Sequence, residues 1–182
     1  MFKRIAVLFS FALSVTAVSL AQMQMAHEAD SRPSPSEHAQ CRFADGKTIS
    51  MDYSSPRMKG RKIFGGLVPY GQVWRTGANE ATTFVTTTDL SVSGKDVPTG
   101  DYTIFTLPNP GKWSLIINKK TGEWGIPYKY ESDELARVDM KVSNASAPVE
   151  NFTIGFDQKG SACVMNLSWE KTAASVEFTE KK

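Results

Sequence analysis

The sequence predicts an all-β fold, an antiparallel β-sandwich or squat barrel of about eight or nine strands. Apolar and polar residues alternate with period 2 in short runs that recur from about residue 41 to the end of the chain. Turn sequences rich in glycine and proline separate these runs. No helical period persists long enough for a βαβ unit, which excludes a Rossmann-type nucleotide-binding fold.

The first 21 residues have the layout of a cleaved secretory signal peptide. Lys3 and Arg4 precede an uncharged run of 16 residues from Ile5 to Leu20, and Ser19-Leu20-Ala21 places small residues where a signal peptidase cuts. A membrane anchor is the alternative, but a spanning helix needs about 20 apolar residues. We therefore expect export across the inner membrane, to the periplasm or the medium, and no membrane span after cleavage.

Residues 22–40 read as a disordered linker, because Pro33, Pro35 and their small polar neighbours cannot bury enough apolar surface to fold. Residues 41–182 are then a single β-sandwich domain, large enough to form one core. Removing Lys3 and Arg4 lowers the number of basic residues from 21 to 19, equal to the 19 acidic ones. A neutral chain has no long-range attraction for nucleic acid, so we expect a small ligand, a glycan or a protein as partner.

The expected strands follow one another at the spacing of an antiparallel sheet. The alternating runs are 49–53, 81–88, 102–107, 113–117, 137–142, 152–156, 163–169 and 176–178. Tight turns are expected at 93–96, 108–111, 120–122 and 159–161, and one helical turn at 132–136. The run 102–107 is apolar on both faces, which indicates a strand covered on both sides.

The histidines limit the chemistry. Both, His27 and His38, precede Cys41, so the expected domain contains no imidazole. A Ser-His-Asp triad, a Cys-His pair and a His-ligated zinc site would each need one, and a flexible segment cannot preorganise a site. Two cysteines cannot supply a four-thiolate site. We expect no metal, no cofactor and, on balance, no enzyme.

Cys41 and Cys163 allow two interpretations. Outside the cytoplasm the pair can form a disulfide, which would close a loop of about 120 residues and stabilise the fold by roughly 3–5 kcal/mol in the chain-entropy model. The alternative is two buried free thiols that act as small hydrophobic side chains.

The segment 54–82 is the least generic part of the chain. Four cations lie within six residues, among glycines: Arg57, Lys59, Arg61 and Lys62. Such a loop can hold a phosphate, a sulfate or a carboxylate, with Arg57, Lys59 and Arg61 as the candidate ligands. The alternative is a solvated turn whose charges keep a sheet edge from pairing with another chain.

Two further sets of residues are candidates for binding. Arg75 and Glu80 form either a polar recognition pair at a cleft or, with Asn79, a structural network within the turn. Trp124 and Tyr128 lie in a loop with Gly125 and Pro127. Loop aromatics stack on sugar rings or grip peptides, and they also cap the end of a sandwich.

These motifs resemble those of the bacterial domain-of-unknown-function 2911 family. The matching segments are 54–82, 97–102, 113–118, 124–125 and 167–170. The resemblance covers about Phe43 to Phe178 and implies a secreted or periplasmic β-rich domain without an established activity. Many members continue after the tryptophan at position 124 with an Asp-Tyr pair, whereas this chain has Ile126-Pro127-Tyr128-Lys129-Tyr130.

Three functions are compatible with the sequence. The first is a non-catalytic binding or accessory module, which requires a concave patch joining Arg75, Glu80 and Trp124. The second is a carboxylate-dependent glycan hydrolase, which requires two acids facing one groove, drawn from Asp52, Glu80 and Glu123. The third is a structural envelope protein whose surface serves assembly. The oligomeric state does not follow from the sequence.

Overall fold

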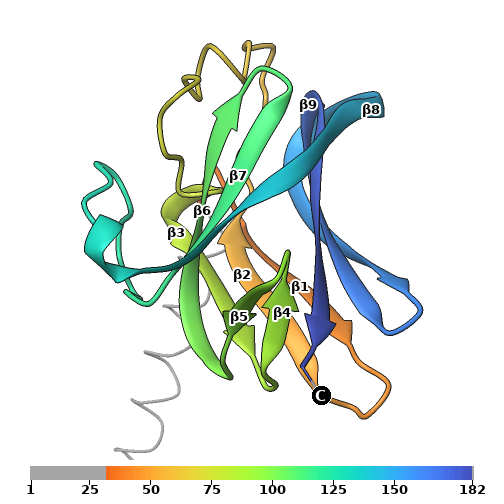
Figure 1. Cartoon of the computed structure of the whole chain (residues 1–182). Helices are drawn as coiled ribbons and strands as arrows, with labels where there is room; N and C mark the ends of the chain where they lie inside the picture. The colour runs from red at the N-terminus through yellow and green to blue at the C-terminus, as the bar shows by residue number, and fades with distance from the viewer. Residues whose placement is uncertain (1–31, 182) are drawn as a thin grey trace, which may run out of the picture.

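Nine antiparallel strands form the part of the chain that this computed structural model describes, residues 32–181 (Figure 1). The strands are β1 (Ser36–Arg42), β2 (Thr48–Ser54), β3 (Ala78–Thr86), β4 (Leu90–Val92), β5 (Lys95–Val97), β6 (Gly100–Asn109), β7 (Lys112–Asn118), β8 (Glu134–Lys159) and β9 (Ala162–Glu180). One 3-10 turn, η1 (Glu131–Asp133), is the helical content of these residues. The all-β prediction is confirmed.

The alternating pattern determines which side chains enter the core. On β2, Ile49 and Met51 are fully buried whereas Asp52 is exposed, as the period of 2 requires. On β6, every residue from Tyr102 to Thr106 is buried, so both faces of this strand are covered. The hairpin turns at Ser93-Gly94 and Gly160-Ser161 lie within the predicted turn segments 93–96 and 159–161.

The strand order is β1-β2-β3-β6-β7-β8-β9-β4-β5, and the sheet does not close. The squat barrel is therefore excluded. Strand β8 is unusually long because it has two partners: residues 134–140 pair with β7, and residues 141–159 pair with β9. Figure 1 shows β8 crossing from the β6–β7 hairpin to β9, so one strand connects the two halves of the sheet.

The two halves pack against each other through aromatic side chains. Phe84 on β3 lies 5.5 Å from Phe178 on β9, and Tyr53 on β2 lies 5.7 Å from Phe152 on β8, both measured between ring centroids. One continuous cluster of buried residues contains these pairs. Burying large rings between two sheet faces is the main stabilising contribution in such an arrangement.

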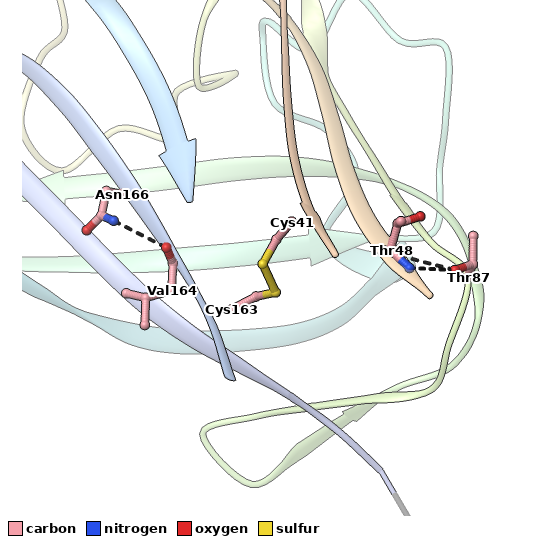
Figure 2. The surroundings of a disulfide bond; sticks show 6 residues. All are labelled: Cys41, Thr48, Thr87, Cys163, Val164 and Asn166. Carbon is pink, nitrogen blue, oxygen red and sulfur yellow. Dashed lines mark hydrogen bonds between the residues drawn. A yellow bond between two sulfur atoms is a disulfide. The ribbon is translucent and has the colours of Figure 1, made fainter. Parts of the chain in front are cut away.

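A disulfide joins Cys41 on β1 to Cys163 on β9, with the two Cα atoms 6.1 Å apart (Figure 2). The bond links residues 122 positions apart and ties one end of the sheet to the opposite half. Cys163 is fully buried and Cys41 almost so. The bridged alternative is thus the one that the structure adopts.

The predicted limits of the linker are wrong at one end. Residues 36–40 were assigned to the disordered linker, but they pair with Ser50–Ser54 as part of β1. The folded domain consequently includes His38, whose Nδ1 lies 2.7 Å from Asp52 Oδ1 on the exposed face of β2. The expectation of a domain without an imidazole is therefore also wrong.

The predicted signal peptide, residues 1–21, and the first part of the predicted linker lie outside the described residues. Within residues 32–181, no helix has the length and apolar character needed to cross a membrane.

Candidate functional site

A long connection between β2 and β3 builds one side of the candidate site. Phe64 and Val68 of this loop are buried in the core, and their backbones form an isolated β-bridge with each other. Gly66 is required here, since a Cβ atom at this position would lie 2.5 Å from the Lys62 carbonyl oxygen. Trp74 then pairs with Thr106 of β6 through two backbone hydrogen bonds of 2.8 and 2.9 Å, so the loop returns to the sheet.

A second loop, residues 119–133, forms the opposite side. Its Tyr128 and Tyr130 pack on Phe105 of β6, with ring centroids 4.8 and 5.9 Å away, in a small apolar cluster separate from the main core. The Tyr128 hydroxyl donates a hydrogen bond to Glu134 Oε1 over 2.7 Å. Burial and this hydrogen bond raise the pKa of Tyr128, so the hydroxyl stays protonated and holds the loop to β8.

An open cleft of about 700 Å³ lies between these loops. Trp74 and Trp169 contribute to its lining, and their rings stack with centroids 5.9 Å apart. Its other apolar and aromatic lining residues are Pro56, Leu67, Val68, Pro69, Val73, Ala78, Ile126, Pro127 and the predicted site residue Tyr128. Its charged lining residues are Arg61, Arg75 and Glu131. This volume and this mixture of apolar walls with few polar groups are typical of small-molecule sites.

The large apolar side chains that remain exposed gather on the two loops. Among the described residues they are Leu67, Tyr70, Trp124 and Ile126, with exposed fractions of 40 to 55%. Leu67 and Ile126 line the cleft itself. Contiguous exposed apolar surface marks an interaction site, and Leu67 and Ile126 provide such surface where they share the cleft.

Arg75 is half-buried beside the cleft. Its guanidinium carbon lies 4.7 Å from the centroid of the Trp124 ring, and Nη1 donates a 3.4 Å hydrogen bond to the Trp124 carbonyl oxygen. Burial lowers the pKa of Arg75, against the opposing effect of the Glu80 charge. The guanidinium remains charged at neutral pH because an arginine pKa starts above 12. Arg75 forms no ion pair with any residue in the described range 32–181.

The three basic residues of the first candidate loop lie in different surroundings. Arg57 donates to Ser55 Oγ, and the backbone N–H of Lys59 donates to Glu150 Oε1. Arg61 donates to the carbonyl oxygens of Met58 and Arg57, so part of its guanidinium fastens the loop to itself. Of these three residues, Arg61 alone is among those that line the cleft.

Asn79 and Glu80 hold the N-terminal segment of the domain. Asn79, in a left-handed conformation with φ of +57°, donates to the Ser34 carbonyl oxygen and to Ser54 Oγ. Glu80 forms an ion pair with Arg32 at 3.1 Å. The structure thus brings Arg75 and Trp124 together, while Glu80 pairs with Arg32 in place of Arg75. Of the three residues that the binding hypothesis joined, Arg75 lines the cleft, and neither Glu80 nor Trp124 is among its lining residues.

Sequence reasoning missed most of the cleft walls. Leu67, Val73, Ile126 and Glu131 line the cleft but were not among the candidates. They lie in loops, where no periodicity indicates which side chains point inward. The sequence signal for these residues was the presence of apolar side chains within turn-rich segments, such as Ile126 next to Pro127. Exposing an apolar side chain to water does not stabilise a loop, so such residues indicate a surface that binds something.

The arrangement disfavours the hydrolase hypothesis. Asp52 is bound to His38, and Glu123 accepts a hydrogen bond from Tyr130. Within residues 32–181, Glu131 is the one carboxylate that lines the cleft, whereas glycoside hydrolysis needs two across the scissile bond. No group of three or more potential metal ligands is present among residues 32–181.

A family model described as "Protein of unknown function (DUF2911)" matches residues 34–178. The match begins two residues before β1 and ends within β9, so it includes both loops of the cleft. No curated protein and no solved structure matches the chain.

Proposed function

The chain belongs to the DUF2911 family, and we propose that it is an exported, non-catalytic binding module whose ligand occupies the cleft between the β2–β3 loop and the loop of residues 119–133. The observation that supports this proposal is the cleft itself. A volume of about 700 Å³ accommodates a small molecule or a few residues of a peptide or glycan.

The location outside the cytoplasm rests on two features. Residues 1–21 have the layout of a signal peptide. The Cys41–Cys163 disulfide is of the kind that persists in an oxidising compartment.

Two-dimensional NMR of the mature protein with a library of neutral fragments tests the binding function. We expect chemical-shift changes to cluster on Leu67, Val73 and Ile126 and on the indole N–H signals of Trp74 and Trp169. Shifts that are absent, or that lie on another face of the sheet, would contradict the proposal.

A pair of substitutions sharpens the test. Ile126→Asp places a charge in the cleft wall at a position that is 44% exposed, so the fold tolerates it and fragment binding falls at least about tenfold. Ala147→Asp adds the same charge at an exposed position of β8 that is not a lining residue, and we expect it to leave binding unchanged.

A further inference from the structure

We infer that the ligand of this cleft carries a single carboxylate on an apolar body, and that Arg75 binds the carboxylate. The inference rests on the proposed binding function and narrows it to a chemical class. It depends on the charges in the cleft, on how Arg75 is held, and on the character of the walls.

Arg75 is a half-buried cation without an acidic partner in the described part of the chain. The nearest candidate, Glu80, is engaged by Arg32 at 3.1 Å. Partial burial of a charge is unfavourable unless another charge or several hydrogen bonds compensate it. A guanidinium has five N–H donors, and within residues 32–181 this one donates a single long hydrogen bond, to the Trp124 carbonyl oxygen. The remaining donors are suited to a bidentate anion.

The surroundings fix the position of Arg75 before any ligand arrives. Its guanidinium lies over the Trp124 ring, a contact that favours a planar cation over an ammonium group. Its Cβ packs so close to the backbone that a Cβ atom on Gly125 would lie 3.0 Å from it. A guanidinium that is already stacked on a ring, on a side chain packed at its base, loses little side-chain entropy when it binds an anion.

The other charged residues of the cleft limit the ligand to one negative charge. Arg61 uses Nε and Nη2 to bind its own loop, which leaves fewer donors for a ligand. Glu131 adds a negative charge to the lining and repels a second anionic group. A monocarboxylate therefore suits the cleft better than a phosphate ester or a dicarboxylate.

The walls favour an apolar body for the ligand. Leu67 and Ile126 are 46% and 44% exposed at the cleft, and Val73, Pro127 and the ring of Trp74 complete an apolar surface. An aliphatic or aromatic group of the ligand placed there removes these side chains from water, and this hydrophobic contribution makes the free energy of binding more favourable.

Isothermal titration calorimetry with matched probes tests the inference. The probes are octanoate, octanamide and octanedioate, and the protein is the mature chain in its disulfide-bonded form. We expect octanoate to bind at least tenfold tighter than octanamide, and octanedioate to bind more weakly than octanoate. In Arg75→Gln the preference for the acid over the amide disappears, while octanamide affinity stays at the wild-type level.

Two variants serve as controls. Arg42→Gln makes the same change at an exposed arginine that donates to the Gly46 carbonyl oxygen and is not a lining residue, so the preference stays as in wild type. Arg75→Lys keeps the positive charge but loses the planar donors. We therefore expect its preference for octanoate over octanamide to lie between those of Arg75→Gln and wild type. Thermal unfolding of each variant establishes that it is folded.

Equal affinity for octanoate and octanamide would overturn the carboxylate assignment and leave the binding function in place. A preference that survives in Arg75→Gln would overturn the role of Arg75. If neither acid nor amide binds, the ligand class is wrong. The neutral-fragment experiment then decides separately whether the cleft binds ligands at all.

Discussion

Gly125 is the residue on which the loop of residues 119–133 depends most directly. Its φ is +88°, and a Cβ atom there would lie 2.8 Å from Ala81 Cβ and 3.1 Å from a carbon of the Phe105 ring. A side chain at this position therefore introduces backbone strain and also overlaps sterically with Ala81 and Phe105.

We expect Gly125→Ala to lower the free energy of unfolding by about 2–4 kcal/mol, from strain and overpacking together. Gly122→Ala is the matched control, because its φ is +72° but nothing lies within 4 Å of the added Cβ, so about 1 kcal/mol is lost. Urea unfolding measures both values. Equal losses in the two variants would show that the close approach at Gly125 contributes nothing.

Glu134 gives the fold a dependence on acid pH. Burial raises the pKa of its carboxyl, but hydrogen bonds from Arg137 and Tyr128 outweigh burial and bring the pKa below the ordinary 4.5. The stabilisation that the ionised Glu134 carboxylate contributes is therefore present above pH 4.5 and is lost as the pH falls through the lower folded-state pKa.

We expect Glu134→Gln to lose less stability than wild type between pH 6 and pH 3, as measured by urea unfolding at each pH. Glu177→Gln, at an exposed position, should retain the wild-type loss.

At the scale of single residues, the sequence indicated polar and aromatic candidates but not how they combine. Arg75 and Trp124 were both proposed, and they contact each other. The pairing of Glu80 with Arg32 was not predictable, since residue 32 lay in a segment assigned to a linker. A contact between residues 48 positions apart depends on the fold, and local sequence does not contain it.

Among the elements, β1 depends most on its covalent link to the other half of the sheet. It lies at the end of the strand order, and Cys41 near its C-terminal end is bonded to Cys163. The double variant Cys41→Ala, Cys163→Ala should lose about 3–5 kcal/mol of unfolding free energy, because the unfolded chain gains freedom when a loop of this length is opened. Urea unfolding checks this value, and a loss under 1 kcal/mol would contradict the entropic argument.

Local sequence predicted the well-patterned strands and missed the polar or short ones. The runs around Met51, Ile104 and Leu115 became β2, β6 and β7. Strand β1 was missed because its sequence is polar, with only Ala39 and Cys41 buried. Strands β8 and β9 were each expected as two shorter strands, because exposed residues interrupt the apolar pattern midway. The two strands pair with each other across this stretch, with register shifts between Asn144 and Thr153 of β8.

For the molecule as a whole, the segment before β1 is part of the folded unit. The Pro35 carbonyl oxygen accepts a 2.9 Å hydrogen bond from the Ser55 N–H, and Asn79 donates to the Ser34 carbonyl oxygen. A chain that begins at Cys41 would lack these contacts and most of β1. We expect its melting temperature to fall by about 10 °C or more relative to a chain that begins at Arg32, since each kcal/mol lost lowers it by about 2–4 °C. Calorimetry of both chains measures the difference, and equal melting temperatures would mean that β1 is dispensable.

The position of Ser34 in the lining of the cleft has a practical consequence for measurement. A tether joined directly to Arg32 would begin two residues from Ser34 and therefore next to the ligand site. Figure 1 places the C-terminus at the far end of the molecule from the β2–β3 loop, and Lys181 there is paired with Asp96. Attaching the protein to a sensor surface through its C-terminus therefore leaves the entrance unobstructed, whereas an N-terminal attachment crowds it.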